Sequence, residues 1–438
     1  MLQMGCATVD VTPPFPTYLR GYASRNKLSD TVEEPVEAGI IALEKDGKKT
    51  LIITVDSLGI EYESCKKITA VIAEKFGINV PDVIISCSHT HFAPGFIAYC
   101  VYAPNGELAL GEHAADQQYF DFWMGKVIPG IEHALADLEA VELQQAEIPV
   151  SSVAFNRRTI RKADGGVTTN YLYPEDPENY DFSPIDTTMH VWKFMRGKHP
   201  KAVLARYGCH PVTGGSDHYA ISADYPGFFK QAIRTQLGCP GFFILGTAGD
   251  VVPMRRNGTS RQDIGEVLAR SVKLYDWTFR KTGDFDLKTA CVMMEVKSNM
   301  LEGKTMQEID NAFNKSLQTA RATGKSPEDF YMDHMRMEFF HVTGGKVTYD
   351  LPIQLMQLGD KVLVCLPFEV LTNVGAKIRE SHPEAVIVSC SCGYQCYLPL
   401  AEDFPKGGYE TDGGTVLAHD TGDRIAAAAI AALDHFNK

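Results

Sequence analysis

Two histidines separated by a single residue, His89 and His91, stand at the end of an apolar run and just before the pair Pro94-Gly95. Side chains two positions apart lie on the same face of an extended chain, so both imidazoles are expected to project together. The carboxyl ends of strands are also where open α/β sheets place their ligands. The spacing is compatible with two metal ligands, with one ligand and a supporting neighbour, or with an ordinary polar strand end.

Further residues that could bind a metal or take part in chemistry are associated with other strand-like runs. His210 follows the run 201–208 and Glu369 follows the run 361–366, while the predicted loop after a fourth run carries Tyr394, Tyr397, Tyr409 and Glu410. Two histidines and a carboxylate with an open coordination position form a standard set for catalytic zinc. These residues are too far apart for a local motif, so their convergence is predicted from strand ends alone.

The elements that must position these residues alternate between strands and helices. Hairpins are predicted over 37–56, 187–208 and 349–366, further strands over 83–88, 150–155, 241–245, 289–297 and 386–391, and helices over 64–76, 114–138, 262–281, 302–322, 370–381 and 425–433. Residues 159–186 are polar and without periodicity, which predicts a long loop. We expect an α/β fold, a single large domain over residues 1–438 with a mixed β-sheet flanked by helices and no internal repeat.

Composition narrows the functional classes. The net charge of -13 and the pI near 5.5 argue against nucleic acid or an anionic membrane as the main partner. No apolar segment reaches the ~18 residues that a transmembrane helix needs. Eleven cysteines and no signal-peptide pattern predict a cytoplasmic protein with free thiols, although a leader removed from the sequence would also be compatible.

Several motifs between residue 8 and about residue 410 together resemble the catalytic domain of the neutral (non-lysosomal) ceramidase family, and they occur in the same order as in that family. The segment 88–95 resembles the family's His-Thr-His-Ser-Gly-Pro-Gly signature, and 397–410 resembles a segment that runs from a ligand tyrosine to a Tyr-Glu pair. The other matching segments are 8–14, 20–25, 156–157, 209–211, 249–253 and 366–369.

The resemblance implies one zinc ion per chain, held by His89, His210, Glu369 and Tyr397. His91 would lie beside the metal as a catalytic residue, and Arg157 would contact the substrate. Ceramidases hydrolyse the amide of ceramide to a sphingoid base and a fatty acid. A metal-activated water would attack, while Tyr397 would ligate the metal or donate to the oxyanion. His91 would carry the proton to the leaving amine.

Some neighbouring residues have simpler interpretations. Arg157 and Arg158 are also compatible with a solvated basic pair, and Asp250 is compatible with a role in stabilising its turn. Tyr394 lies close to Tyr397 in sequence and is an alternative to it as the tyrosine of the site. The cysteines near the histidines do not have a typical zinc spacing and are expected to be buried thiols; a cysteine-dependent redox protein is a distant alternative.

The sequence also departs from the family pattern. Val252 replaces the serine of Gly-Asp-Val-Ser-Pro, which leaves a metal-bound water rather than a serine as the nucleophile, and Phe368 and Phe92 add bulk near the proposed site. The chain ends soon after the last motif, so the family's C-terminal immunoglobulin-like domain is expected to be absent. We therefore predict a zinc-dependent hydrolase of a linear amide, either ceramide or a smaller N-acyl amine. An esterase on the same site, or a non-catalytic binding protein with the same fold, is the alternative.

Overall fold

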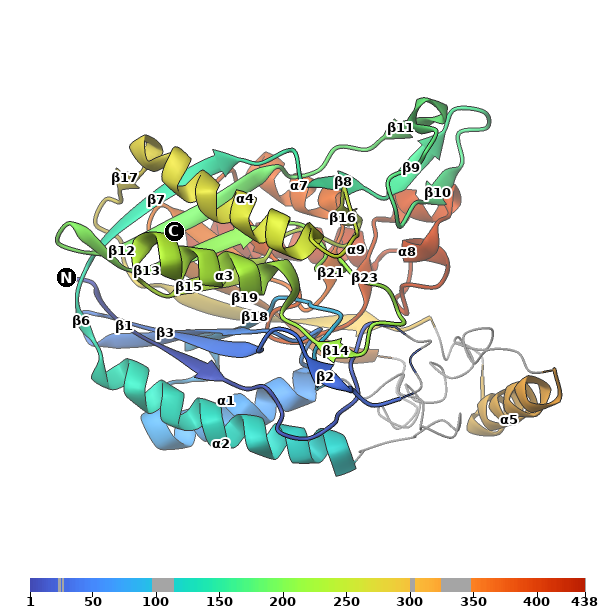
Figure 1. Ribbon diagram of the computed structural model, residues 1–438, viewed down its shortest axis with the longest axis horizontal. Coiled ribbons are helices and arrows are strands. Elements are labelled where there is room, and N and C mark those ends of the chain that lie inside the picture. Colours follow the sequence, from blue (N-terminus) through green and yellow to red (C-terminus); the bar gives the residue numbers. More distant parts are fainter. Residues whose placement is uncertain (23–24, 26, 97–113, 300–303, 324–347, 438) are drawn as a thin grey trace.

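The computed structural model describes residues 1–22, 25, 27–96, 114–299, 304–323 and 348–437. Within these ranges it is a mixed α/β structure in which three mixed sheets are covered by helices on their outer faces (Figure 1). The predicted fold class is therefore confirmed.

The first sheet contains the N-terminal strands in the order β5-β4-β3-β1-β6. The predicted hairpin forms from β3 and β4, and its turn residues Asp46 and Gly47 both have positive φ (52° and 82°), as the type I′ turn of a two-residue hairpin requires. The edge strand β5 runs parallel to β4 after a crossover helix. The elements of this part are β1 (Gln3–Asp10), β3 (Glu37–Lys45), β4 (Lys48–Val55), α1 (Tyr62–Phe76), β5 (Val83–Cys87), α2 (Ala114–Ala136) and β6 (Glu139–Ala140).

The second sheet has the order β15-β13-β12-β7-β17, and helices α3 and α4 lie side by side over it (Figure 1). The predicted hairpin β12–β13 forms, and β15 is parallel to β13. The helix predicted over 262–281 is too long: it ends at Leu274, and the chain then forms a short strand that pairs with β7. The elements are β7 (Glu142–Pro149), β12 (Thr188–Arg196), β13 (His199–Tyr207), α3 (Asp224–Leu237), β15 (Gly241–Leu245), α4 (Ser260–Leu274) and β17 (Arg280–Lys281).

The third sheet has the order β18-β19-β20-β22 and is covered by helices near the C-terminus of the chain. Strand β22 is parallel to β20, and the predicted hairpin β19–β20 forms. The elements are β18 (Thr289–Lys297), α5 (Met306–Thr323), β19 (Thr348–Leu358), β20 (Lys361–Cys365), α7 (Thr372–Ser381), β22 (Ala385–Val388) and α9 (Thr421–Phe436).

The same arrangement occurs in each of these sheets. An antiparallel strand (β1, β7 or β18) lies beside a hairpin, and a crossover helix then leads to a strand parallel to the second hairpin strand. The sequence shows no repeat, but the topology does. A central core lies among the three sheets, where side chains such as Ile52, Leu204, Phe242 and Leu363 pack together. Burial of this apolar surface stabilises the arrangement and fixes the sheets relative to one another.

The carboxyl ends of the three parallel strands meet. The backbone N–H of Ser389, just after β22, donates to the carbonyl of Leu245 at the end of β15 over 2.9 Å. The N–H of Cys392 donates to the carbonyl of Ile85 in β5 over 2.7 Å, and Ser86 forms a bridge with Ser391. Loops from all three sheets are thereby brought to one place.

Residues 159–186, which were predicted as a loop, instead contain a small three-stranded sheet of order β10-β9-β11 that projects from the body of the molecule (Figure 1). Short paired strands complete the fold, and the helical pieces α8 and η5 lie near the C-terminus. These elements are β2 (Thr31–Val32), η1 (Val80–Asp82), β8 (Ala154–Asn156), β9 (Arg158–Arg161), β10 (Val167–Thr169), η2 (Pro177–Asn179), β11 (Tyr180–Phe182), β14 (Ala220–Ile221), β16 (Val251–Pro253), η3 (Asp276–Thr278), β21 (Glu369–Val370), β23 (Tyr397–Leu398), η5 (Ala401–Lys406) and α8 (Tyr409–Asp412).

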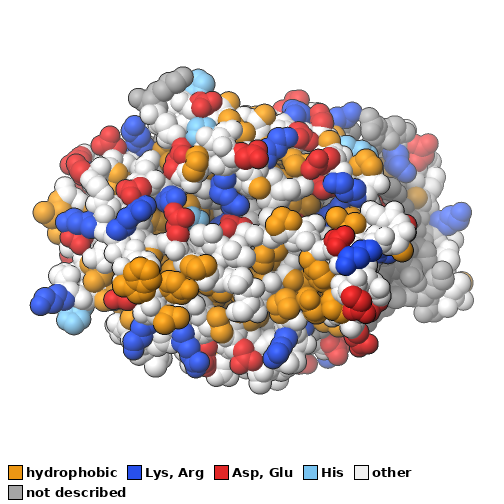
Figure 2. Space-filling view, turned by 90° about the horizontal axis from the view of Figure 1, so that it is seen from above, with side chains coloured by type: hydrophobic (Ala, Val, Ile, Leu, Met, Phe, Trp, Pro, Cys, Tyr) orange, Lys and Arg blue, Asp and Glu red, His pale blue; other side chains and the backbone are white. Residues whose placement is uncertain are grey.

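The surface carries both signs of charge. On the face seen in Figure 2, Lys and Arg side chains alternate with Asp and Glu, and hydrophobic side chains fill the areas between them. Among the described residues, no helix combines the length and the apolar composition that crossing a bilayer requires.

Candidate metal centre

The histidine pair lies in the loop that follows β5. The strand ends at Cys87, and His89 has a left-handed backbone (φ 68°), so the pair does not lie on an extended chain as predicted. The two rings nevertheless meet: His89 Nε2 and His91 Nε2 are 3.4 Å apart. His89 Nδ1 is 2.7 Å from the carbonyl oxygen of Leu58, which can only accept, so His89 Nδ1–H donates and Nε2 carries the lone pair in the neutral ring.

His210 enters the same space from the loop after β13. Its Nδ1–H donates to the carbonyl oxygen of Ala248 over 2.5 Å, which fixes its tautomer in the same way. Burial lowers the pKa of His210 to about 4, so the ring is neutral near neutral pH. Its Nε2 therefore presents a lone pair to the site.

Glu369, the first residue of β21, completes a compact group. Its Oε2 lies 3.2 Å from His89 Nε2 and 3.0 Å from His210 Nε2. Burial by itself would raise the pKa of Glu369, but the two imidazoles beside the carboxylate hold this pKa well below its usual range. The carboxylate is therefore ionised although the side chain is almost completely buried.

This arrangement fits a cation. Each Nδ1 proton is committed to a backbone carbonyl, so at each Nε2–Oε2 contact of 3.0–3.2 Å a proton or a metal cation must lie between the ring and the ionised carboxylate. Nitrogen and carboxylate oxygen are the donors that zinc takes in catalytic sites. The ligand atoms of His89, His91 and His210 also lie within 4.8 Å of one another, so His91 is within reach of the same space.

Two tyrosines border the group. The hydroxyl of Tyr397 lies 3.4 Å from His210 Nε2, and its strand β23 pairs in parallel with β21 so that Tyr397 stands opposite Glu369. Tyr394 donates its hydroxyl proton to Glu369 Oε1 over 2.5 Å. Burial and the Glu369 charge raise the pKa of Tyr394, which keeps it a donor. Sequence analysis named Tyr394 only as a neighbour of Tyr397, and no motif indicated its contact with the carboxylate.

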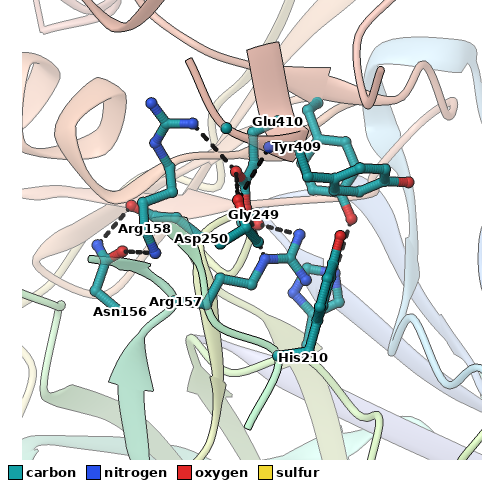
Figure 3. Close-up of polar contacts among 12 residues, drawn as sticks. Asn156, Arg157, Arg158, His210, Gly249, Asp250, Tyr409 and Glu410 are labelled. Carbon is teal, nitrogen blue, oxygen red and sulfur yellow. Dashed lines mark hydrogen bonds and ion pairs between the residues drawn. The ribbon is translucent and has the colours of Figure 1, made fainter. Parts of the chain in front are cut away.

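Arg157 is the arginine that faces the site. Its Nε donates to Glu410 Oε1 over 2.6 Å and its Nη2 to the carbonyl of Gly249 over 3.0 Å (Figure 3). Its guanidinium carbon lies 5.3 Å from the centre of the Tyr397 ring, which is a cation–π contact. Arg158 binds the other oxygen of Glu410 over 3.1 Å. Both arginines are buried, which rules out the interpretation as a solvated basic pair.

Asp250 has a structural role in these contacts. Its Oδ1 accepts hydrogen bonds from the backbone N–H (2.9 Å) and the hydroxyl (2.8 Å) of Thr372, and its Oδ2 accepts from Asn156 Nδ2 over 2.7 Å. Because both oxygens are satisfied within the protein, Asp250 ties β8 and the loop before β16 to the start of α7.

The residues that depart from the ceramidase pattern are packed away. Val252 is fully buried in a small cluster with Phe155 and Val212, and Phe368 is fully buried in the core of the third sheet. Their added volume is therefore accommodated by the core. Burial also raises the pKa values of the Cys209 and Cys390 thiols, which leaves these cysteines unreactive and disfavours a thiol-based site.

The fold and the site define an α/β protein with a candidate metal centre at converging strand ends. Residues 2–237, more than half of the chain, match the family model described as neutral/alkaline non-lysosomal ceramidase, N-terminal. The chain belongs to this family, as its motifs suggested.

Individual relatives are distant. The chain is 24% identical over 280 residues to neutral ceramidase B from Dictyostelium discoideum, a match that covers 59% of this chain and 36% of that protein. The chain thus spans about a third of the length of this curated relative. The structure of a neutral ceramidase from Pseudomonas aeruginosa superposes with a TM-score of 0.73 at 16% identity, covering 99% of this chain and 75% of that one. A structure of a ceramidase complexed with C2 gives a TM-score of 0.72 at 15% identity, covering 99% and 76%. These structures share the fold.

Proposed function

We propose that this protein is a zinc-dependent hydrolase of a linear amide, with ceramide or a smaller N-acyl amine as the substrate. The observation that carries the proposal is the convergence of His89 Nε2, His210 Nε2 and Glu369 Oε2 in one buried space. Family membership supports an amide as the scissile group, while the low identity to the relatives leaves the choice between ceramide and a smaller amide to experiment.

His89, His210 and Glu369, with the Tyr397 hydroxyl, are the residues that would hold the zinc ion. Bound there, zinc would supply a Lewis acid and lower the pKa of a coordinated water towards ~7. The protein supports these residues from behind. The carbonyls of Leu58 and Ala248 hold the two imidazole rings in one tautomer, and Tyr394 holds the carboxylate.

The remaining residues have roles that follow from their own chemistry. His91 is the residue we assign to proton transfer, because its Nδ1 has no hydrogen-bond partner among the described residues and burial, together with His89, lowers its pKa well below the usual value. A proton that it accepts is readily released to a leaving amine. Arg157 packs against the Tyr397 ring and is held by Glu410 and Gly249, and we assign its remaining guanidinium N–H groups to a substrate oxygen.

Metal analysis tests the proposal. After zinc reconstitution and desalting, elemental analysis of the purified protein should give about one zinc per chain. His210→Ala should lose metal and activity together, whereas His199→Ala, at the exposed opposite end of β13, should lose neither. A fully metallated and active His210→Ala variant would remove this residue from the ligand set. A wild-type protein that holds no metal would sink the hydrolase proposal and favour a binding function.

The substrate is identified by comparing ceramide, a short N-acyl amine and the matching ester. Turnover of ceramide would establish ceramidase activity. Turnover of only the short amide, or only the ester, would establish the corresponding alternative on the same residues.

A further inference from the structure

Arg157 is surrounded by three tyrosine rings that lead from the candidate metal centre to the surface. The guanidinium carbon lies 5.3 Å from the ring centre of Tyr397, 5.7 Å from that of Tyr409 and 5.6 Å from that of Tyr171. Each ring also contacts the next one in space: the ring centres are 5.4 Å apart for Tyr397 and Tyr409 and 6.0 Å apart for Tyr409 and Tyr171. Tyr397 is buried, Tyr409 is half-buried, and Tyr171 is 46% exposed. Tyr171 is therefore the outermost member of this chain of rings.

The backbone around Tyr171 is held firmly in this position. The N–H of Asn170 donates to the carbonyl of Arg157 over 2.8 Å, and Arg256 Nη1 donates to the carbonyl of Tyr171 over 3.0 Å. The Asn170 side chain donates to the Thr159 hydroxyl over 2.7 Å. An exposed aromatic residue on a fixed backbone offers apolar contact area at a low cost in conformational entropy.

The surroundings of Tyr171 indicate what it would contact. The next residue, Leu172, is 62% exposed, so two consecutive apolar side chains face solvent, and the first of them contacts the arginine. The acidic residues of this segment, Glu175, Glu178 and Asp181, stand among Arg161, Lys162 and Arg256, and Lys162 is paired with Asp181 over 3.7 Å, so the segment carries no strong charge of one sign that would bind an ionic group. An uncharged hydrocarbon chain is the ligand group that fits this surface.

We propose that Tyr171, with Leu172, is a specificity-determining residue that binds the hydrocarbon chain of the substrate next to Arg157. The proposal rests on the proposed function, because it presumes that the amide of the substrate lies at the candidate metal centre. It assigns a role to the connection between β10 and β11 and predicts that the protein prefers long-chain N-acyl amines to short ones.

The test compares variants on substrates that differ only in chain length, with the acyl chain lengthened in one series and the amine chain in another. Tyr171→Ala should lower kcat/KM for the long-chain member of one series by roughly 10-fold, mainly through KM, and leave the acetyl amide of a short amine nearly unchanged. Tyr171→Phe should restore the long-chain value because the ring, not the hydroxyl, makes the contact.

Tyr173→Ala is the matched control. Tyr173 is similarly exposed (39%) and lies two residues away, but its ring packs on Phe155 and Phe182 and not on Arg157. It also lines a cavity of about 520 Å³ with Met254 and Ile264. A loss that is selective for long chains in Tyr173→Ala but not in Tyr171→Ala would place the hydrocarbon chain in that cavity and overturn the proposal. An equal loss for short and long substrates in Tyr171→Ala would also overturn it, because the role would then be structural.

A binding measurement separates this inference from the proposed function. If the wild-type protein hydrolyses none of the amides, calorimetric titration with the long-chain and short-chain N-acyl amines is made on the same variants. A weaker affinity of Tyr171→Ala for the long-chain compound alone would support the binding role without catalysis. Equal affinities of the variant and the wild type would refute it.

Discussion

Glu410 is the anion that allows two arginines to be buried beside the candidate metal centre. It is completely buried, and its carboxylate accepts hydrogen bonds from Arg157 Nε (2.6 Å), Arg158 Nη1 (3.1 Å) and the hydroxyl of Thr169 (3.3 Å). Burial alone would raise the pKa of Glu410, but the two guanidinium groups lower it. The change Glu410→Gln keeps the shape of the side chain and removes its charge.

The size of the effect follows from what remains after the change. Removing one partner of a buried ion pair costs about 3–5 kcal/mol, because the other charge stays buried without compensation. Two arginines lose their counter-ion here, but Arg157 keeps its bond to the carbonyl of Gly249, and Arg158 keeps a long one (3.4 Å) to the carbonyl of Asp403. The glutamine also retains an acceptor oxygen. We therefore expect a loss near the lower end of that range, about 3 kcal/mol in the free energy of unfolding.

Urea denaturation measures this loss as a lower midpoint at an unchanged slope. The matched control is Glu142→Gln, which removes the same charge from a surface ion pair of similar length, 2.5 Å to Lys281, and should cost less than about 0.5 kcal/mol. A further signature is the pH dependence. Because the pKa of Glu410 is lowered in the folded state, its stabilisation is present above the unfolded value and is lost as the pH falls. The difference between variant and wild type should therefore shrink below roughly pH 4. A cost of Glu410→Gln as small as that of Glu142→Gln would refute the reasoning.

Two other changes test the roles of single histidines. Gly21 has φ +109°, and a Cβ at this position would lie 2.5 Å from the ring of His91. Gly21→Ala should therefore displace His91 and lower kcat at least ~10-fold while the zinc content is retained. Loss of the metal in this variant would instead make His91 a ligand. Burial, reinforced by the charge of Arg206, lowers the pKa of His190 to about 3 from an ordinary value of 6.5. Between these two pH values the folded state binds fewer protons than the unfolded state, so the free energy of unfolding falls as the pH is lowered. Urea midpoints of His190→Gln should fall less steeply than those of the wild type between roughly pH 6 and 4, by up to about 1.4 kcal/mol per pH unit, and equal slopes would contradict the assignment.

Much of the candidate site could be predicted from the sequence because its histidines and carboxylate follow closely after apolar strands. The runs before His89, His210 and Glu369 form β5, β13 and β20, and the three side chains lie together. Family motifs indicated Arg157 and Tyr397, and the structure brings both to the same space.

Other features depend on contacts that no local pattern encodes. Tyr394 reaches Glu369 only because the loop after β22 returns beside β21, and the left-handed backbone of His89 arises where the strand ends at Cys87. The β9–β11 sheet is formed from polar strands of three or four residues, which are too short to show a period of two. Its position is fixed by long-range bonds such as that between Arg158 and Glu410.

The repeated topology explains how candidate ligands so distant in sequence come together. Each of the three sheets ends in a parallel strand pair, and the loops that follow the two strands of a pair support each other. In the first sheet the Leu58 carbonyl holds His89, in the second the Ala248 carbonyl holds His210, and in the third the Tyr394 hydroxyl holds Glu369.

Each sheet therefore contributes one oriented side chain to the candidate metal centre, and the central core that packs the three sheets together fixes the distances between these side chains. The same geometry explains why the fold can accommodate Val252 and Phe368, the two buried residues that depart from the family pattern. Ligand positions depend on where the parallel strands end and on the bonds between their loops, so bulk that is absorbed in the surrounding cores leaves the ligand atoms in place. A close-packed core of this kind supplies the rigid support that a preorganised metal site needs.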